Sequence, residues 1–68
     1  MKTKLLEEIH NSLLNGQKKQ MVEQINNYGL YDFFEDYNTY LCNLYNESIV
    51  KHSYFLDCVS SYHRITNR

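Results

Sequence analysis

The histidines and cysteines are the residues whose types could support metal binding or catalysis. Glu7 and His10 form an E-x-x-H pattern, which supplies part of the ligand set of a di-iron site in a helical bundle. Such a site needs a second copy of the pattern and two further glutamates, whereas this sequence holds one copy. The pattern therefore predicts no di-iron centre.

A zinc site or a cysteine nucleophile would draw on a second set of residues. Structural zinc sites favour closely spaced ligand pairs such as C-x-x-C, and no such pair is present. Cys58 and His63 stand five residues apart, on different faces of a helix, so they cannot act as a nucleophile and its base within one helix. We therefore expect no metal, no cofactor, no catalytic residue and no enzymatic activity. The candidate ligands considered were Cys42, His52, Cys58 and His63.

The basic C-terminal end offers a different chemistry. Arg64 and Arg68 stand one turn apart on a predicted helix, where two guanidinium groups could hold a phosphate. Tyr62 and His63 lie beside them in the sequence, and a tyrosine ring can stack on a base. These four residues predict an alternative function, the binding of a nucleotide-like anionic ligand at a subunit interface.

Nucleic acid is not an expected partner. Affinity for a polyanion grows with the number of phosphates that the protein neutralises, and this chain has a net charge of −1. A helix-turn-helix around Gly29 is a further alternative, but its recognition helix would carry Glu35 and Asp36 in the turn that meets the base edges. Residues 20–50 contain no lysine or arginine that could compensate.

The aromatic content favours a protein partner. Seven tyrosines and three phenylalanines are more than a 68-residue core can hide, and both residue types are common at protein interfaces. The third predicted helix combines several of them with acidic side chains. The predicted partner-binding residues are Tyr31, Glu35, Asp36, Tyr40 and Tyr45.

Apolar spacing predicts an all-α fold, three to four short helices packed as a small bundle in one domain. The helices are expected at residues 3–14, 17–28, 32–45 and 49–66. Asn15-Gly16 and Gly29 are expected to end the first two, while Asp32 with Glu35 forms a capping box for the third. Ser48 is the expected cap of the fourth, although a strand near residues 54–59 is an alternative. Its predicted buried stripe comprises Ile49, His52, Phe55, Leu56, Val59, Tyr62 and Ile65.

Size and charge together favour a homodimer. A lone core in a chain below about 70 to 80 residues seldom supplies more than about 3 to 5 kcal/mol, so a second subunit would help. Charge is also sorted along the chain, because residues 1–19 and 51–68 are basic and residues 20–50 are acidic, which suits a self-complementary interface. Ordinary solvated helix faces are the alternative. No apolar run long enough for a membrane span and no secretion signal are present, so a cytoplasmic protein without a membrane partner is expected.

Three stretches resemble small helical proteins encoded by phages and prophages. They run from Asn15 to Val22, from Tyr31 to Tyr37 and from Ser61 to Ile65. The abundance of Asn, Tyr, Leu and Lys agrees with an AT-rich genome, as in a low-GC bacterial host. The resemblance implies an accessory protein that binds and blocks a host protein, for example a defence or regulatory factor. It assigns no functional residue.

Overall fold

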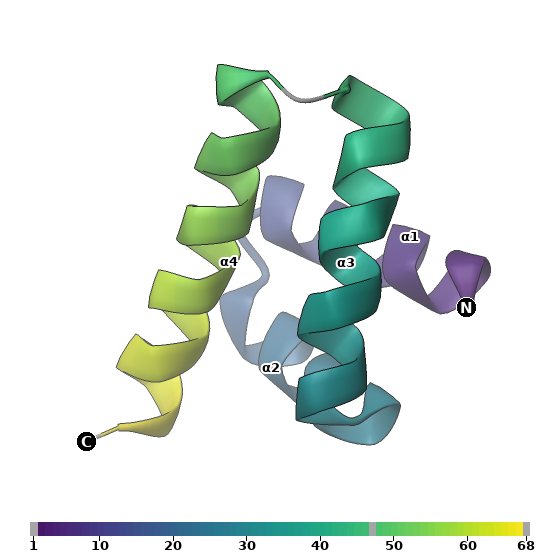
Figure 1. Ribbon diagram of the computed structural model, residues 1–68. Helices are drawn as coiled ribbons and strands as arrows, with labels where there is room; N and C mark the ends of the chain where they lie inside the picture. The colour runs from purple at the N-terminus through teal and green to yellow at the C-terminus, as the bar shows by residue number, and fades with distance from the viewer. Residues whose placement is uncertain (1, 47, 68) are drawn as a thin grey trace.

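The protein is all-helical in a computed structural model that describes residues 2–46 and 48–67 (Figure 1). The elements are α1 (Thr3–Leu14), α2 (Lys18–Tyr28), α3 (Leu30–Tyr45) and α4 (Ile49–Thr66). This confirms the predicted fold class. The alternative of a strand near residues 54–59 is wrong, because α4 runs without interruption through that segment. None of the helices in the described part of the chain is long and apolar enough to cross a membrane.

Glycine and serine residues lie at several of the helix ends. Gly16 and Gly29 adopt φ values of 75° and 108°, which side chains with a Cβ rarely adopt, and they follow the ends of α1 and α2. The hydroxyl of Ser48 accepts a hydrogen bond from the backbone N–H of Lys51 at 3.3 Å, which confirms the predicted cap of α4. These turns therefore form as the sequence predicts.

The predicted capping box of the third helix is wrong. Gly29 alone connects α2 to α3, so α3 begins at Leu30, two residues earlier than expected, and no side chain caps it. Asp32 lies inside the first turn, where its negative charge still interacts favourably with the helix dipole.

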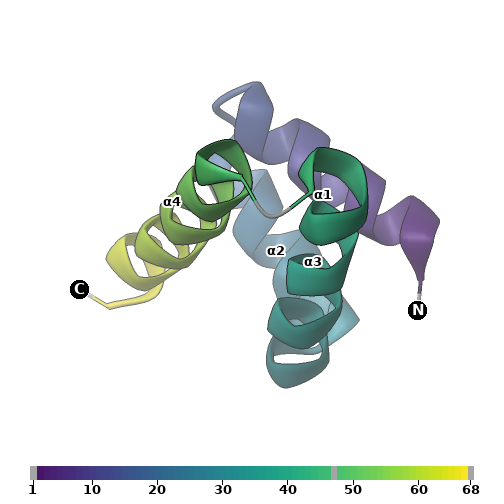
Figure 2. The ribbon, with the colours of Figure 1, turned by 45° about the horizontal axis from the view of Figure 1, so that its top comes forward.

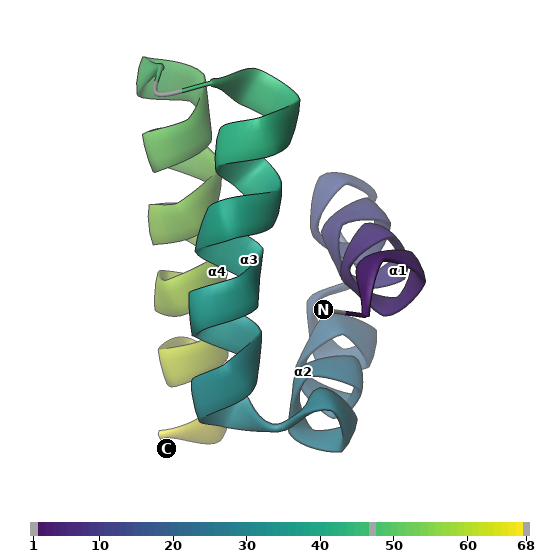
Figure 3. The ribbon, with the colours of Figure 1, turned by 45° about the vertical axis from the view of Figure 1, so that its right-hand side comes forward.

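The helices form two layers. α3 and α4 run antiparallel as a hairpin, and α1 and α2 pack together against one side of it (Figures 2 and 3). The whole molecule measures 33 × 23 × 21 Å. Because α1 and α2 cover one side only, the opposite side of the hairpin faces solvent.

The core lies between the two layers. α1, α2 and α3 bury most of the apolar residues that their spacing predicts, although Leu5, Leu14 and Leu44 are exposed. Phe33 and Tyr37 are among the largest fully buried side chains. The full set of buried apolar residues is Leu6, Ile9, Leu13, Met21, Val22, Ile25, Tyr28, Phe33, Tyr37, Leu41 and Cys58.

The predicted buried stripe of α4 is wrong in part. The two fully buried residues of α4 are Cys58 and Ser61, and their small side chains seat the helix against the core. By contrast, Ile49 and Leu56 are 88% and 55% exposed, and His52 is also exposed. The helix is therefore turned about its axis relative to the prediction, which leaves part of its apolar surface in solvent.

Candidate functional site

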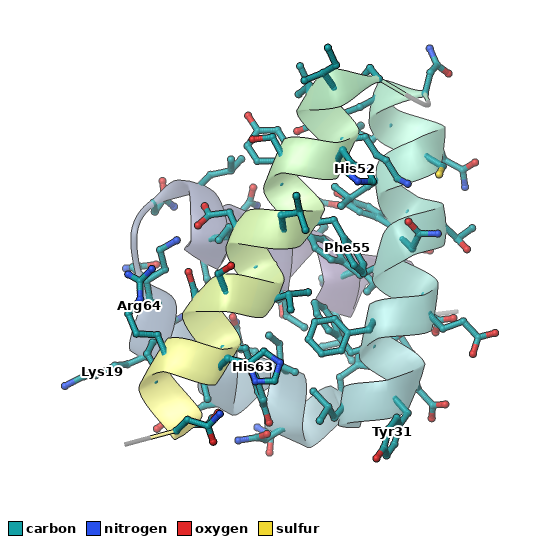
Figure 4. All side chains as sticks on the ribbon, turned by 60° about the vertical axis from the view of Figure 1, so that its left-hand side comes forward. Lys19, Tyr31, His52, Phe55, His63 and Arg64 are labelled. Carbon is teal, nitrogen blue, oxygen red and sulfur yellow. The ribbon has the colours of Figure 1, made fainter. Side chains whose placement is uncertain are left out.

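The outward side of the α3–α4 hairpin is the candidate binding surface, and we call it the outer face. α4 buries Cys58 and Ser61, so helical spacing turns Leu56 away from the core. On α3, Tyr31 is 88% exposed at the start of the helix. Tyr31, His52 and His63 all lie on this side in Figure 4. The outer face comprises Tyr31, Glu35 and Asn38 of α3 and Ile49, His52, Leu56, Val59 and His63 of α4.

Aromatic rings form the floor of the outer face in the seam between the two helices. The rings of Phe34 and Phe55 lie 6.1 Å apart between centroids and meet at 62°. Tyr62 approaches Phe34 at the same distance, with nearly perpendicular rings. All three side chains are half-buried, and Figure 4 shows Phe55 in the seam. Edge-to-face packing of this kind fixes the separation of α3 and α4, so the floor is firm.

Charge on the outer face is confined to one end. Along α4, Ile49, Leu56 and Val59 are apolar, and Glu35 is the only Asp, Glu, Lys or Arg residue in the defined set. Because the hairpin is antiparallel, the start of α3, with Asp32 and Glu35, lies level with the end of α4, with His63 and Arg64. The middle of the outer face is therefore uncharged, while this end carries acidic groups on one helix and basic groups on the other.

A hollow adjoins the outer face at the start of α4. It has a volume of about 480 Å³ and is lined by Ser48, Ile49, Lys51 and His52. It is open to solvent, so it cannot exclude water as a catalytic pocket does, but it can receive a side chain of a partner protein.

The five predicted partner-binding residues do not form one surface. Tyr31 and Glu35 are exposed on the outer face. The carboxylate of Asp36 accepts a hydrogen bond from the Tyr28 hydroxyl at 2.6 Å, on the side of α3 that faces α2. Tyr40 and Tyr45 are half-buried against the core.

Tyr40 and Tyr45 belong to a buried cluster around His10. The Nδ1 and Nε2 atoms of His10 lie 2.8 and 2.9 Å from the hydroxyl oxygens of Tyr37 and Tyr45. The rings of Tyr40 and Tyr54 meet the imidazole edge-on at 5.9 and 5.2 Å between centroids. Burial lowers the pKa of His10 and raises the pKa of Tyr37, because the charged form of each side chain would be deprived of hydrating water.

This cluster is a structural centre that the sequence analysis missed. Both ring nitrogens of His10 are occupied by tyrosine hydroxyls, so the E-x-x-H histidine joins α1 to α3 instead of offering a metal ligand. A signal was present, since His10 stands four residues after Leu6 and three before Leu13, on the apolar side of α1. Among the described residues, no three His, Cys, Asp or Glu side chains come together to hold a metal ion.

The residues of the alternative anion site are spread over different surroundings. The hydroxyl of Tyr62 donates a hydrogen bond to the side-chain oxygen of Asn26 at 2.6 Å, and its ring packs against Phe34. His63 and Arg64 are exposed in the last turn of α4. In Figure 4, Arg64 lies on the flank of α4 towards Lys19, while His63 lies towards α3. Arg68 lies outside the described residues.

The buried cysteine cannot serve as a nucleophile. Cys58 is fully buried, and its sulfur lies 4.0 Å from the sulfur of Met21. Burial raises the pKa of the Cys58 thiol to about 12, so the reactive thiolate does not form near neutral pH. Cys58 is therefore a small buried side chain of the core, whereas Cys42 is only half-buried.

No protein-family model, curated protein or solved structure matches this chain. Interpretation of its function therefore depends on the chemistry of its surfaces. The outer face presents exposed apolar side chains, among them Ile49 and Leu56, beside polar ones over an ordered aromatic floor, and this combination is typical of a protein-binding surface.

Proposed function

We propose that this chain is a small non-enzymatic accessory protein of phage type that binds and blocks a host protein through the outer face. The host protein is a defence or regulatory factor of a low-GC bacterium, and this chain binds it in the cytoplasm. In its free state the chain is a homodimer.

The exposed apolar surface along α4 is the observation that carries this proposal. Leu56 is 55% exposed and Ile49 is 88% exposed, although both lie on a well-formed helix whose other side packs in the core. Leaving large apolar side chains in water costs about 25 cal/mol for each Å² of apolar surface. A partner that covers this surface recovers that free energy, so binding is favourable without any charged anchor at the centre.

The aromatic floor makes the same surface suitable for tight binding. The residues that contribute most of the binding free energy lie near the centre of an interface, in well-packed and rigid surroundings. The packed rings of Phe34 and Phe55 in the seam between α3 and α4 provide such surroundings, and Tyr31 adds an exposed ring at one edge.

Affinity capture with matched variants tests the proposal. We would immobilise the wild-type chain, Leu56→Glu and Leu14→Glu, and incubate each with lysates of low-GC bacteria. Leu14 is a matched control, because it is 49% exposed and lies on α1, in the other layer of the fold. We expect a bacterial protein that the wild-type chain and Leu14→Glu retain and Leu56→Glu loses.

The captured protein would then be purified and its affinity measured by calorimetry. A charge at the centre of an interface costs on the order of 2 kcal/mol or more, so Leu56→Glu should weaken binding by about 30-fold or more. Equal binding of all three proteins would place the site elsewhere and contradict the proposal. Circular dichroism of each variant verifies that the helices are intact.

A further inference from the structure

We propose that a second copy of the chain covers the outer face in the free protein, with its two-fold axis parallel to α3 and α4. In this arrangement α3 of each copy lies over α4 of the other, and the four helices form a bundle. This inference rests on the proposed function, because it concerns the same surface and describes how access to it is regulated.

The dimensions of the outer face favour a second copy over a single partner helix. α4 has 18 residues and is therefore about 27 Å long, and α3 lies beside it for most of that length. A standard interface buries about 800 Å² on each partner, which is about a sixth of the 4625 Å² of accessible surface here. A lone helix would cover the seam between α3 and α4, whereas a second hairpin covers both helices along their whole length.

Charge complementarity selects the direction of the axis. Asp32 and Glu35 at the start of α3 lie at the same end of the hairpin as His63 and Arg64 at the end of α4. When α3 of one copy lies over α4 of the other with the axis parallel to the helices, this end of one copy meets the same end of the other. Asp32 and Glu35 of each copy then lie at the same edge of the interface as Arg64 of the other, which extends from the flank of α4, and this pairing occurs twice in every dimer.

The other symmetric stacking lacks these pairs. With the axis perpendicular to the helices, α4 would lie antiparallel over α4 of the second copy, and its end with His63 and Arg64 would meet the start of the other α4, where residues 49–52 include no acidic side chain. The acidic start of α3 would then meet the end of the other α3, where Cys42, Asn43 and Asn46 offer no positive charge. The charged ends of both helices would then lack partners of opposite sign, which disfavours this stacking.

Self-association on this surface regulates the proposed function. The outer face cannot contact a second copy and a host protein at once, so the host protein must displace one protomer. The complex with the host protein therefore contains one copy of this chain, although the free protein contains two.

Paired charge reversals test this arrangement. We would prepare Glu35→Arg and Arg64→Glu separately and measure mass by light scattering after gel filtration at low micromolar concentration. Each single variant opposes like charges twice in its own homodimer, so its dimer dissociation constant should rise on the order of tenfold. An equimolar mixture of the two variants restores both opposite-charge pairs, and we expect it to dimerise about as tightly as the wild-type chain. Glu23→Arg makes the same charge change at an exposed position of α2 and should leave dimerisation unchanged.

Two results would overturn the inference. A wild-type chain that is folded and monomeric at low micromolar concentration would exclude the homodimer. A mixture that associates no better than its two components would exclude the parallel axis. Either result leaves the host-binding proposal intact if capture of the host protein still depends on Leu56. Conversely, if the wild-type chain dimerises as expected but Leu56→Glu captures the host protein as well as the wild-type chain does, only the host-binding proposal is contradicted.

Discussion

The buried histidine makes folding stability sensitive to acid, and this can be worked out from the structure. His10 is enclosed by four tyrosines, and each of its ring nitrogens forms a hydrogen bond with a tyrosine hydroxyl group. Burial lowers its pKa in the folded chain below the ordinary value of about 6.5. As the pH falls, the unfolded chain therefore takes up a proton at His10 before the folded chain does.

The sign and size of the effect follow from proton linkage. Above about pH 7.5 the histidine is neutral in both states and the free energy of unfolding is constant. Below about pH 6.5 the unfolded state binds more protons, so the free energy of unfolding falls by up to about 1.4 kcal/mol for each pH unit, until the folded pKa is reached. Between about pH 6.5 and 5.0 the loss amounts to at most about 2 kcal/mol, a large share of the roughly 3 to 10 kcal/mol expected for a domain of this size.

Urea denaturation at several pH values, followed by circular dichroism, measures this dependence. His10→Gln removes the titrating group and should be less stable than the wild-type chain at pH 7.5 but show a flatter pH profile between pH 7.5 and 5.0. Tyr45→Phe removes one hydrogen bond but keeps the histidine, so its profile should retain the wild-type slope. The reasoning is refuted if the wild-type chain is equally stable across this range, or if His10→Gln loses stability with acid as steeply as the wild-type chain does.

Three further predictions concern the core and the turns. Tyr37→Phe leaves Nδ1 of His10 without its partner in a buried site and should lower the free energy of unfolding by about 1 to 3 kcal/mol, measured by urea denaturation. Gly29→Ala forces a Cβ into a backbone with φ of 108° and should cost about 1 to 2 kcal/mol, seen as a lower melting temperature; an unchanged melting temperature would contradict this. A thiol reagent should label Cys42 in the native chain and Cys58 only after denaturation, which mass spectrometry of the labelled peptides would show.

Sequence patterns predicted the parts of the fold in which one local rule decides the outcome. Leu6, Ile9 and Leu13 recur at helical spacing and define the buried side of α1, with Leu5 and Leu14 at its exposed margins. Gly16 and Gly29 end helices because their backbone conformations are costly for other residues. No neighbouring helix has to be known for either inference.

The orientation of α4 could not be predicted in the same way. Both of its sides carry apolar residues, so hydrophobicity gives no preference between the stripe that contains Leu56 and the one that contains Cys58. The choice depends on the space left by the other helices, where the small Cys58 and Ser61 fit closely. The candidate site shares this dependence, because Tyr31 and Leu56 lie on one surface only after α4 has taken this orientation.

The small number of buried side chains on α4 has a consequence for local unfolding. Cys58 is the one residue of α4 among the fully buried apolar side chains, whereas α1, α2 and α3 each contribute several. Backbone amide hydrogens of a helix exchange with deuterium at a rate set by the opening reaction of lowest free energy that exposes them to water. In the isolated protomer those of α4 should exchange faster than those of α1 to α3, as α4 separates from a core that stays assembled. A second hairpin packed on the outer face would hinder this separation of α4. Slower amide exchange confined to α4 would therefore indicate that the chain has dimerised.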